Sequence, residues 1–220
     1  MGFSELVIIA VYMSLIAFCI GISLYKKAIS DSVFLTLTIL LIITLIVESI
    51  GYYNILTKNR IVGWLFSVFL PVQYFLYALY FRSIIKSVKI KKMIAISIVF
   101  LFVWNICNTI FFQNLQTLNT YAIIIACLFY CAWSSIYLTQ LLQAPQTDTL
   151  SQNPHFWICT GTLFFYSTSF FIIAFIQIIN KGNNELASRL WFLVRIFNII
   201  LYGLYAYGFI CQTKHQNLPS

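Results

Sequence analysis

The chain has 220 residues and a net charge of +8, and 61% of its residues are apolar while only 8% are charged. Soluble domains carry roughly 25% charged residues, so this composition excludes a water-soluble fold and indicates that lipid is the solvent for much of the surface. Seven membrane-spanning helices of about 20 residues each would use about 140 residues. The remainder suffices for short connections but not for a separate soluble catalytic domain.

Seven apolar stretches follow one another along the chain, each long enough for a helix that crosses the ~30 Å hydrocarbon layer. Helix is the only secondary structure expected for them, because lipid-exposed backbone must satisfy its own hydrogen bonds and the alternating polar residues of a membrane barrel are missing. The sequence therefore predicts an all-α, polytopic membrane protein, a single domain over residues 1–220 built as a seven-transmembrane-helix bundle. The expected spans are Leu6–Tyr25, Val33–Asn54, Ile61–Arg82, Met93–Gln113, Leu118–Leu142, His155–Asn180 and Leu190–Gln212.

Basic residues in the connections decide the expected orientation, because Lys and Arg favour the cytoplasmic side. Eight of them fall on one side of the predicted bundle and four on the other, which predicts the N-terminus outside and the C-terminus inside. One inner connection, residues 143–154, disagrees weakly because it has no basic residue. The eight are Lys26, Lys27, Arg82, Lys86, Lys89, Lys91, Lys92 and Lys214, and the four are Lys58, Arg60, Lys181 and Arg189.

Five of these basic residues, from Arg82 to Lys92, lie in the single connection between the third and fourth spans. A basic cluster next to a membrane is typical of topology control and of contact with anionic lipid headgroups, so we expect no nucleic-acid partner. The expected partner is the lipid bilayer. The expected location is a cell membrane, namely the bacterial inner membrane. The oligomeric state is left open.

A weak internal repeat relates the third span to the seventh. Aligning Leu65–Ala78 with Leu193–Ala206 matches six of fourteen positions. The alignment predicts a parallel 3+1+3 duplication, with halves at 6–82 and 118–212 and a linker helix at 93–113. Shared apolar composition is the alternative explanation. A real duplication would favour a transporter, since some transporters are built from parallel repeats.

Glu48 and Arg195 are the only two charges deep inside the predicted spans. At 1.5 Å per residue, each lies roughly 8–9 Å below the outer boundary. A charge that faces the bilayer centre costs at least about 2.5–3.5 kcal/mol, so both side chains are expected to face inward and to pair. The alternative is a purely structural salt bridge between the second and seventh spans.

Further polar residues fall near the same depth and extend the predicted site. Asn105 and Asn108 are three residues apart and share one face of the fourth span, while Asn198 and Tyr202 lie on the helical stripe of Arg195. These residues predict a polar pocket in the outer half of the bundle, with Glu48 and Arg195 as the anchoring pair and the asparagines as orienting groups. Interhelical hydrogen bonding without a pocket is the alternative, at about 0.6 kcal/mol per bond on average in membranes.

Catalysis has little support in the sequence. It contains no serine-nucleophile motif, no zinc-protease motif and no glycine-rich phosphate loop, and His155 is expected ~15–20 Å from Glu48, too far for acid–base work. The aromatic stripe of Tyr130, Trp133 and Tyr137 has the spacing of core packing rather than of a cofactor site. We therefore expect no enzyme activity, no cofactor and no metal site.

Two resemblances bear on function. The 3+1+3 arrangement resembles the sugar-transporting and PQ-loop families and the vitamin-precursor transporters. PQ-loop proteins carry Pro-Gln in both repeats, whereas here Pro145-Gln146 occurs once, in a polar loop, and the first repeat lacks it. The stretch Asn153-Pro154-His155-Phe156-Trp157-Ile158, with Gly161, Tyr166 and Glu48, resembles uncharacterised small seven-helix bacterial membrane proteins of the sensor or accessory type. That second resemblance implies a cytoplasmic signalling partner, such as a kinase, and no catalytic residue.

The leading hypothesis is an integral membrane sensor-type or accessory protein whose outer-half pocket binds a small ligand, a lipid or a partner helix. A small 3+1+3 transporter is the alternative. A membrane-embedded lipid-modifying enzyme is the third, and it would need a second acid, base or metal ligand near Glu48.

Overall fold

The structure is a computed structural model of the whole chain, and it describes residues 3–25, 28–57, 63–113, 119–143, 150–179 and 184–216. The described residues form α-helices and two short 3-10 helices, and none of them is in a strand. In chain order the elements are α1 Phe3–Tyr25, η1 Ala28–Ser30, α2 Ser32–Leu56, α3 Gly63–Ile84, α4 Val88–Phe111, α5 Thr120–Gln143, η2 Leu150–Gln152, α6 Pro154–Ile179 and α7 Asn184–Gln216.

Within the described residues, seven helices are long and apolar enough to cross a membrane. The expectation of an all-α chain with seven such helices is therefore confirmed. The largest boundary differences lie at the starts of α4 and α7, which begin at Val88 and Asn184 rather than at Met93 and Leu190. Hydropathy underestimates these helices because a helix can continue past the apolar layer with polar and charged residues in its first turns.

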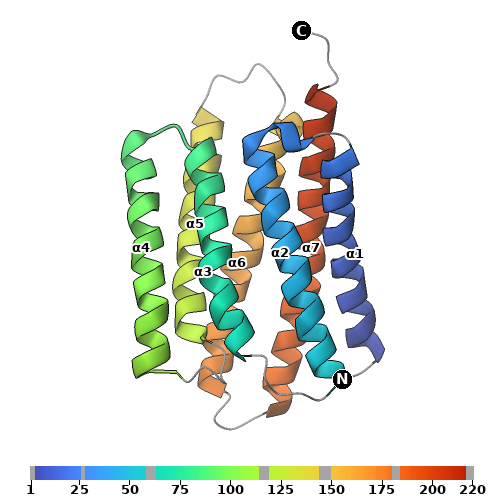
Figure 1. Cartoon of the computed structure of the whole chain (residues 1–220), viewed down its shortest axis with the longest axis vertical. Helices are drawn as coiled ribbons and strands as arrows, with labels where there is room; N and C mark the ends of the chain where they lie inside the picture. The colour runs from blue at the N-terminus through green and yellow to red at the C-terminus, as the bar shows by residue number, and fades with distance from the viewer. Residues whose placement is uncertain are drawn as a thin grey trace.

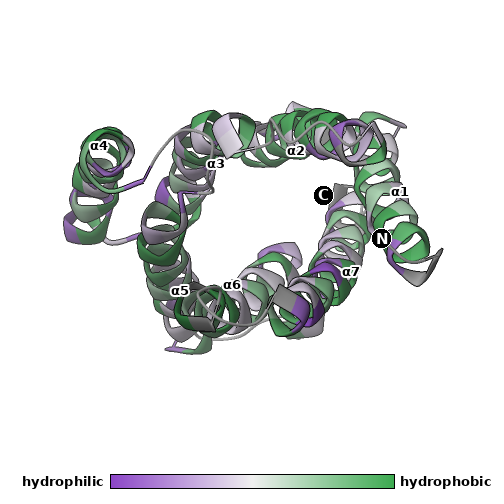
Figure 2. Ribbon diagram, turned by 90° about the horizontal axis from the view of Figure 1, so that it is seen from below, coloured by the Kyte–Doolittle hydropathy of each residue, from purple (hydrophilic) through white to green (hydrophobic). Residues whose placement is uncertain are grey.

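Six of the described helices form a closed ring, and the seventh lies outside it (Figure 2). Contacts run from α1 to α2, α2 to α3, α3 to α5, α5 to α6, α6 to α7 and α7 back to α1. Helix α4 packs against α3 and α5 on the outside of the ring. Consecutive helices alternate in direction, so the connections lie at the two ends of the bundle (Figure 1).

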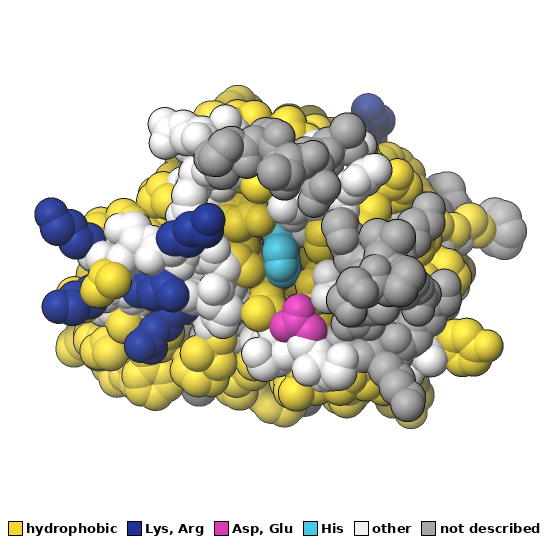
Figure 3. Space-filling view, turned by 90° about the horizontal axis from the view of Figure 1, so that it is seen from above, with side chains coloured by type: hydrophobic (Ala, Val, Ile, Leu, Met, Phe, Trp, Pro, Cys, Tyr) yellow, Lys and Arg dark blue, Asp and Glu magenta, His cyan; other side chains and the backbone are white. Residues whose placement is uncertain are grey.

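The two ends differ in charge. The basic end, where α3 passes into α4, carries exposed Arg82, Lys86, Lys89 and Lys92, and Figure 3 shows Lys and Arg side chains gathered on one side of this face. The N-terminal end is the one where α1 begins (Figure 1).

Several residues used above to predict orientation and family resemblance lie outside the described residues or have side chains that are not described, namely Lys26, Lys27, Lys58, Arg60, Pro145, Gln146, Lys181 and Lys214.

The bundle is apolar on its outside and rich in tyrosine on its inside. Ile46, Phe102 and Phe171 project from the surface with more than half of their area exposed, as expected where lipid is the solvent. The three side chains of the aromatic stripe on α5 are buried, as expected for core packing, but one of them, Tyr130, also lines the cavity described below. The largest fully buried side chains include Tyr74, Tyr80, Tyr130 and Tyr205.

Glycines set the tight packing of α6 against α7. A Cβ atom on Gly208 would lie 2.9 Å from Cγ1 of Ile158 and 3.0 Å from the carbonyl oxygen of Pro154. A Cβ atom on Gly161 would lie 3.2 Å from Cβ of Leu204. Small residues allow helix backbones to approach closely in membranes. The close contact between α6 and α7 holds α7 in the ring, and α7 carries several of the polar residues discussed below.

The predicted 3+1+3 repeat stays a prediction, but two features of the fold bear on it. Helix α4 lies outside the ring, where a linker between two three-helix halves would lie. Tyr77 and Tyr205, which the alignment pairs, have their hydroxyl oxygens 2.7 Å apart. A two-fold axis between the halves would produce this kind of contact.

Candidate functional site

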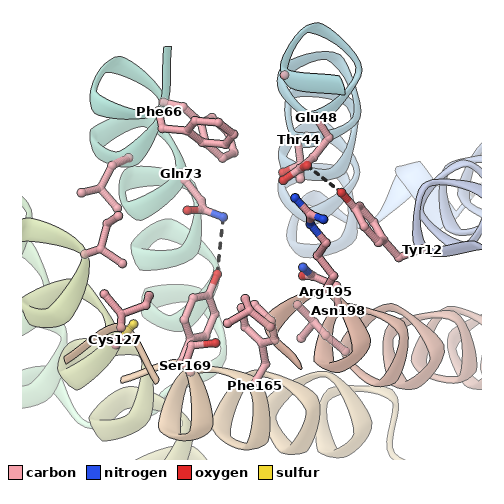
Figure 4. Close-up of a pocket in the computed structure, with 18 of the residues that line it drawn as sticks. Tyr12, Thr44, Glu48, Phe66, Gln73, Cys127, Phe165, Ser169, Arg195 and Asn198 are labelled. Atoms are coloured by element: carbon pink, nitrogen blue, oxygen red, sulfur yellow. Dashed lines mark hydrogen bonds between the residues drawn. The ribbon is translucent and has the colours of Figure 1, made fainter. Parts of the chain in front are cut away.

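A cavity of about 430 Å³ lies inside the ring. In the described part of the chain, all six ring helices contribute to its lining and α4 contributes none. Its volume falls in the range of small-molecule sites, which are mostly apolar and carry a few convergent polar groups. The polar groups come mainly from Thr44 and Glu48 on α2, Gln73 on α3, Ser169 on α6, and Arg195 and Asn198 on α7 (Figure 4).

Glu48 is held in place by the neighbouring helix α1. The hydroxyl of Tyr12 donates a hydrogen bond to Oε2 of Glu48 at 2.8 Å. The Tyr12 ring also stacks against Tyr202 of α7, with the ring centroids 6.3 Å apart. Tyr12 therefore connects the carboxylate-bearing helix to the guanidinium-bearing helix, although no sequence pattern singled it out.

The predicted Glu48–Arg195 ion pair is corrected by the structure. Both side chains line the same cavity and extend toward the same space (Figure 4), but Arg195 makes its ion pair with Glu5, with 3.6 Å between Nη1 and Oε1. The reason is the order of helices around the ring. Helix α1 lies between α2 and α7 in the ring, so each charge has its direct partner on α1, Tyr12 for Glu48 and Glu5 for Arg195.

Asn105 and Asn108 do not belong to the cavity, which corrects a second expectation. They lie on α4, outside the ring, and are buried between helices. Nδ2 of Asn105 donates to the carbonyl oxygen of Ser67 on α3 at 3.2 Å. Nδ2 of Asn119, at the start of α5, donates to Oδ1 of Asn105 at 2.6 Å, and Asn108 donates to the Asn119 side chain.

These three asparagines and their neighbours form what we call the asparagine cluster (Asn105, Asn108, Thr109, Gln113, Asn119 and Thr120). Asn108 also donates to Oε1 of Gln113 at 2.9 Å, and Gln113 donates to the hydroxyl of Thr120 at 2.7 Å. Such a network fastens one helix to its neighbours. For Asn105 and Asn108, the interhelical alternative is therefore the one that the structure shows.

Asn198 and Tyr202 do line the cavity, one turn apart on α7 and adjacent to Arg195. The helical stripe and the depth argument placed Glu48, Arg195, Asn198 and Tyr202 together, and the structure brings these four to one space. Counting residues along each helix was enough to bring these four residues to one cavity. It failed for α4 because depth does not say whether a helix lies inside the ring.

Several lining residues were not selected from the sequence. Gln73 donates a long hydrogen bond of 3.4 Å to the hydroxyl of Tyr166, and both residues line the cavity. Tyr130 and Ser169 are buried, and within the described residues neither hydroxyl has a hydrogen-bond partner. Isolated polar residues in apolar spans are the only signal that could have marked them.

A layer of hydrogen-bonded aromatic residues closes the cavity toward the basic end. Tyr77 and Tyr205 lie one helical turn beyond the lining residues Gln73 and Tyr202, and the Tyr205 hydroxyl is also 2.7 Å from that of Thr162. One turn further, the Tyr80 hydroxyl is 3.1 Å from Nδ1 of His155. The hydrogen bonds within this layer hold α3, α6 and α7 together.

The chemical groups of the cavity follow from its lining residues. Among the described residues no group of three His, Cys, Asp or Glu side chains is placed to hold a metal ion. Of the described Asp, Glu and His side chains, Glu48 alone lines the cavity, and general acid–base chemistry needs a partner within hydrogen-bond reach of the reacting atoms. The polar groups that line the cavity are a carboxylate, a guanidinium, amides and hydroxyls, and aromatic side chains surround them.

No family model, no curated protein and no solved structure matches the chain.

Proposed function

We propose that this chain is a multi-pass membrane protein that binds a small organic molecule in the ring cavity and acts as a sensor-type or accessory module. The observation that carries the proposal is the cavity itself. It has the volume of a small-molecule site, and it holds Glu48 and Arg195 inside a membrane-type bundle. Ionisable residues inside membrane bundles are costly and usually mark a functional site.

The proposed orientation places the N-terminus outside, at the surface of a bacterial inner membrane, so that the cavity lies in the outer half. Exposed Arg82, Lys86, Lys89 and Lys92 at the opposite end support this choice, because basic residues concentrate on the cytoplasmic side. A ligand would then be captured from the outer side or from the outer leaflet of the bilayer.

The aromatic layer offers a route from ligand to output. Tyr202 lines the cavity, and Tyr205, one turn on, is bonded to α3 through Tyr77 and to α6 through Thr162. A ligand that changes the spacing of α3, α6 and α7 would alter this layer and move the helix ends at the basic end. A cytoplasmic signalling partner would read that movement at the basic surface.

A fragment screen tests the binding proposal without assuming the charge of the ligand. Purified protein in nanodiscs is heated with a library of small anionic, neutral and cationic aromatic compounds, and the unfolding temperature is recorded. Ser169→Phe fills the cavity from α6, and Ser167→Phe, a matched change two residues away that does not line the cavity, is its control.

We expect a subset of compounds to stabilise the wild type and Ser167→Phe but not Ser169→Phe, since a ligand stabilises only the state that binds it. A library in which no compound stabilises the wild type, or in which the two variants respond alike, would contradict the proposal.

A transporter is the second candidate, because α4 lies outside a ring composed of α1–α3 and α5–α7 and because Tyr77 meets its aligned counterpart Tyr205. Such a ring, with a cavity closed at one end, fits alternating access by two halves. Proteoliposomes loaded with a compound from the screen should then exchange it for external labelled compound. Binding without any exchange would leave the sensor or accessory role alone.

A further inference from the structure

The charges around the cavity do not balance. Glu5, Glu48 and Arg195 are the described charged residues that line the cavity or pair with a lining residue. Two carboxylates and one guanidinium leave one net negative charge when all three are ionised. The other described ion pair at this end, Glu185–Arg189, is exposed and internally neutral.

Arg195 makes its ion pair with Glu5 and acts on Glu48 only through space, without a direct ion pair. Its guanidinium is 3.6 Å from Glu5, whereas Glu48 receives its direct hydrogen bond from the neutral hydroxyl of Tyr12. An ionised carboxylate away from water is stable only with a compensating charge and hydrogen bonds. The cavity therefore has room for a positive charge next to Glu48.

The wall across the ring from Glu48 presents unused hydrogen-bonding groups. The hydroxyls of Tyr130 on α5 and Ser169 on α6 are buried and, within the described residues, have no hydrogen-bond partner although both residues line the cavity. Figure 4 shows α6, with Ser169, on the side of the cavity that faces α2 and Glu48. Buried polar groups normally find a partner, and a ligand that spans the cavity would supply one.

Aromatic side chains form much of the remaining lining. Tyr12, Tyr52, Phe66, Phe165 and Trp191 come from five different helices and enclose the space between these polar groups. Aromatic faces attract ammonium groups through their quadrupoles, and this attraction is the usual basis for recognising quaternary ammonium compounds. They repel anions for the same reason.

We infer that the ligand of this cavity is a small organic cation, an aromatic or aliphatic amine or quaternary ammonium compound whose positive charge lies beside Glu48 and whose opposite end meets Tyr130 and Ser169. This inference rests on the proposed function and narrows it to one class of ligand. An anionic ligand would have to compete with Glu5 for Arg195 and would add a further negative charge.

Three compounds of similar size and shape but different net charge show how ligand charge affects binding to the cavity. Benzyltrimethylammonium is the cation, neopentylbenzene is its neutral carbon analogue, and benzylsulfonate is an anion of similar size. Binding to the full chain in nanodiscs is measured by equilibrium dialysis, with empty nanodiscs subtracting partition into lipid. The variants are Glu48→Gln, which keeps an oxygen acceptor for Tyr12, and Glu185→Gln, which removes an exposed carboxylate near the same end of α7.

We expect the cation to bind at least tenfold more tightly than the neutral analogue, and the anion to bind weakest. Glu48→Gln should reduce cation affinity at least tenfold and leave the affinity of the neutral analogue within twofold, which also shows that the variant is folded. Glu185→Gln should change neither affinity by more than twofold.

Equal binding of the cation and the neutral analogue, with both lost in Ser169→Phe, would overturn the inference and leave the proposed binding function intact. Tightest binding of the sulfonate would overturn it in favour of Arg195 as the anchor. Failure of all three probes would also overturn it, and the fragment screen, which covers every charge class, then decides the proposed function separately.

Discussion

The cavity and the asparagine cluster are two polar regions in the same half of one apolar bundle, yet they differ in how their polar groups are satisfied. In the asparagine cluster, side-chain amides bond to one another and to the backbone of α3, as Asn119 does with Asn105. In the cavity, the hydroxyls of Tyr130 and Ser169 have no hydrogen-bond partner among the described residues, and Glu48 and Arg195 line one space without a direct ion pair. Polarity within a membrane protein is thus not enough to mark a site. An unpaired group does not mark one by itself either, since Oδ1 of Asn108 in the asparagine cluster also has no hydrogen-bond partner among the described residues. The cavity, which the asparagine cluster does not line, distinguishes the two regions.

The largest effect that this comparison predicts is on stability in the asparagine cluster. Asn119→Ala removes the acceptor of Asn108 and the donor to Asn105, and we expect a loss of about 2 kcal/mol in the free energy of unfolding, because several bonds of about 0.6 kcal/mol are lost and buried amides are left unpaired. The measurement is unfolding in mixed micelles by titration with dodecyl sulfate.

Asn198→Ala is the matched control on the cavity wall. Asn198 faces a cavity that can admit water, so the same truncation should cost about 0.5 kcal/mol or less. Equal losses for the two asparagines would remove the distinction between the two regions.

The second effect is on the link between α1 and α2. Tyr12→Phe deletes the 2.8 Å hydrogen bond to Glu48, and hydrogen bonds to charged groups contribute about 1.5 kcal/mol or more, so we expect a loss of about that size. In the Glu48→Gln background the same change should cost about half as much, because the acceptor is then neutral. Identical costs in both backgrounds would mean that the charge of Glu48 plays no part in holding α1.

The sequence predicted the seven helices well, but it predicted poorly which helices pack against one another. The physical reasons for the success and for the failure differ. Length and apolarity are local properties of each span, so all seven helices were predicted. Depth along the helix axis is nearly local as well, and it correctly placed Glu48 and Arg195 in one cavity together with Asn198.

The order of helices around the ring was the missing information. A single sequence does not state that α1 separates α2 from α7, or that α4 is excluded from the ring. Both corrected predictions, the partner of Arg195 and the position of Asn105, follow from that order. Contacts between helices depend on long-range packing, which periodicity in one span cannot reveal.

The smallest predicted effect is on the stability of two variants that each remove one serine hydroxyl. Ser97→Ala removes a side chain that accepts from Tyr74 at 2.7 Å and donates to the carbonyl oxygen of Ile94 at 2.7 Å, and it should cost about 1 kcal/mol. Ser169→Ala removes a buried hydroxyl that has no partner among the described residues. It should leave the free energy of unfolding unchanged or raise it by up to about 1 kcal/mol, since an unsatisfied polar group is removed.

Ser169→Ala should weaken ligand binding even though it does not reduce the stability of the protein. For 4-hydroxybenzyltrimethylammonium, a cation with a hydroxyl at its far end, Ser169→Ala should lower affinity about threefold, because the ligand loses a hydrogen-bond partner whose net worth is about 0.5–1.5 kcal/mol. The parent benzyltrimethylammonium, which has no hydroxyl, should bind both proteins alike. If Ser169→Ala instead destabilises the protein as much as Ser97→Ala does, then its hydroxyl is bonded within the bundle, and the far wall of the cavity is fastened in the same way as the asparagine cluster.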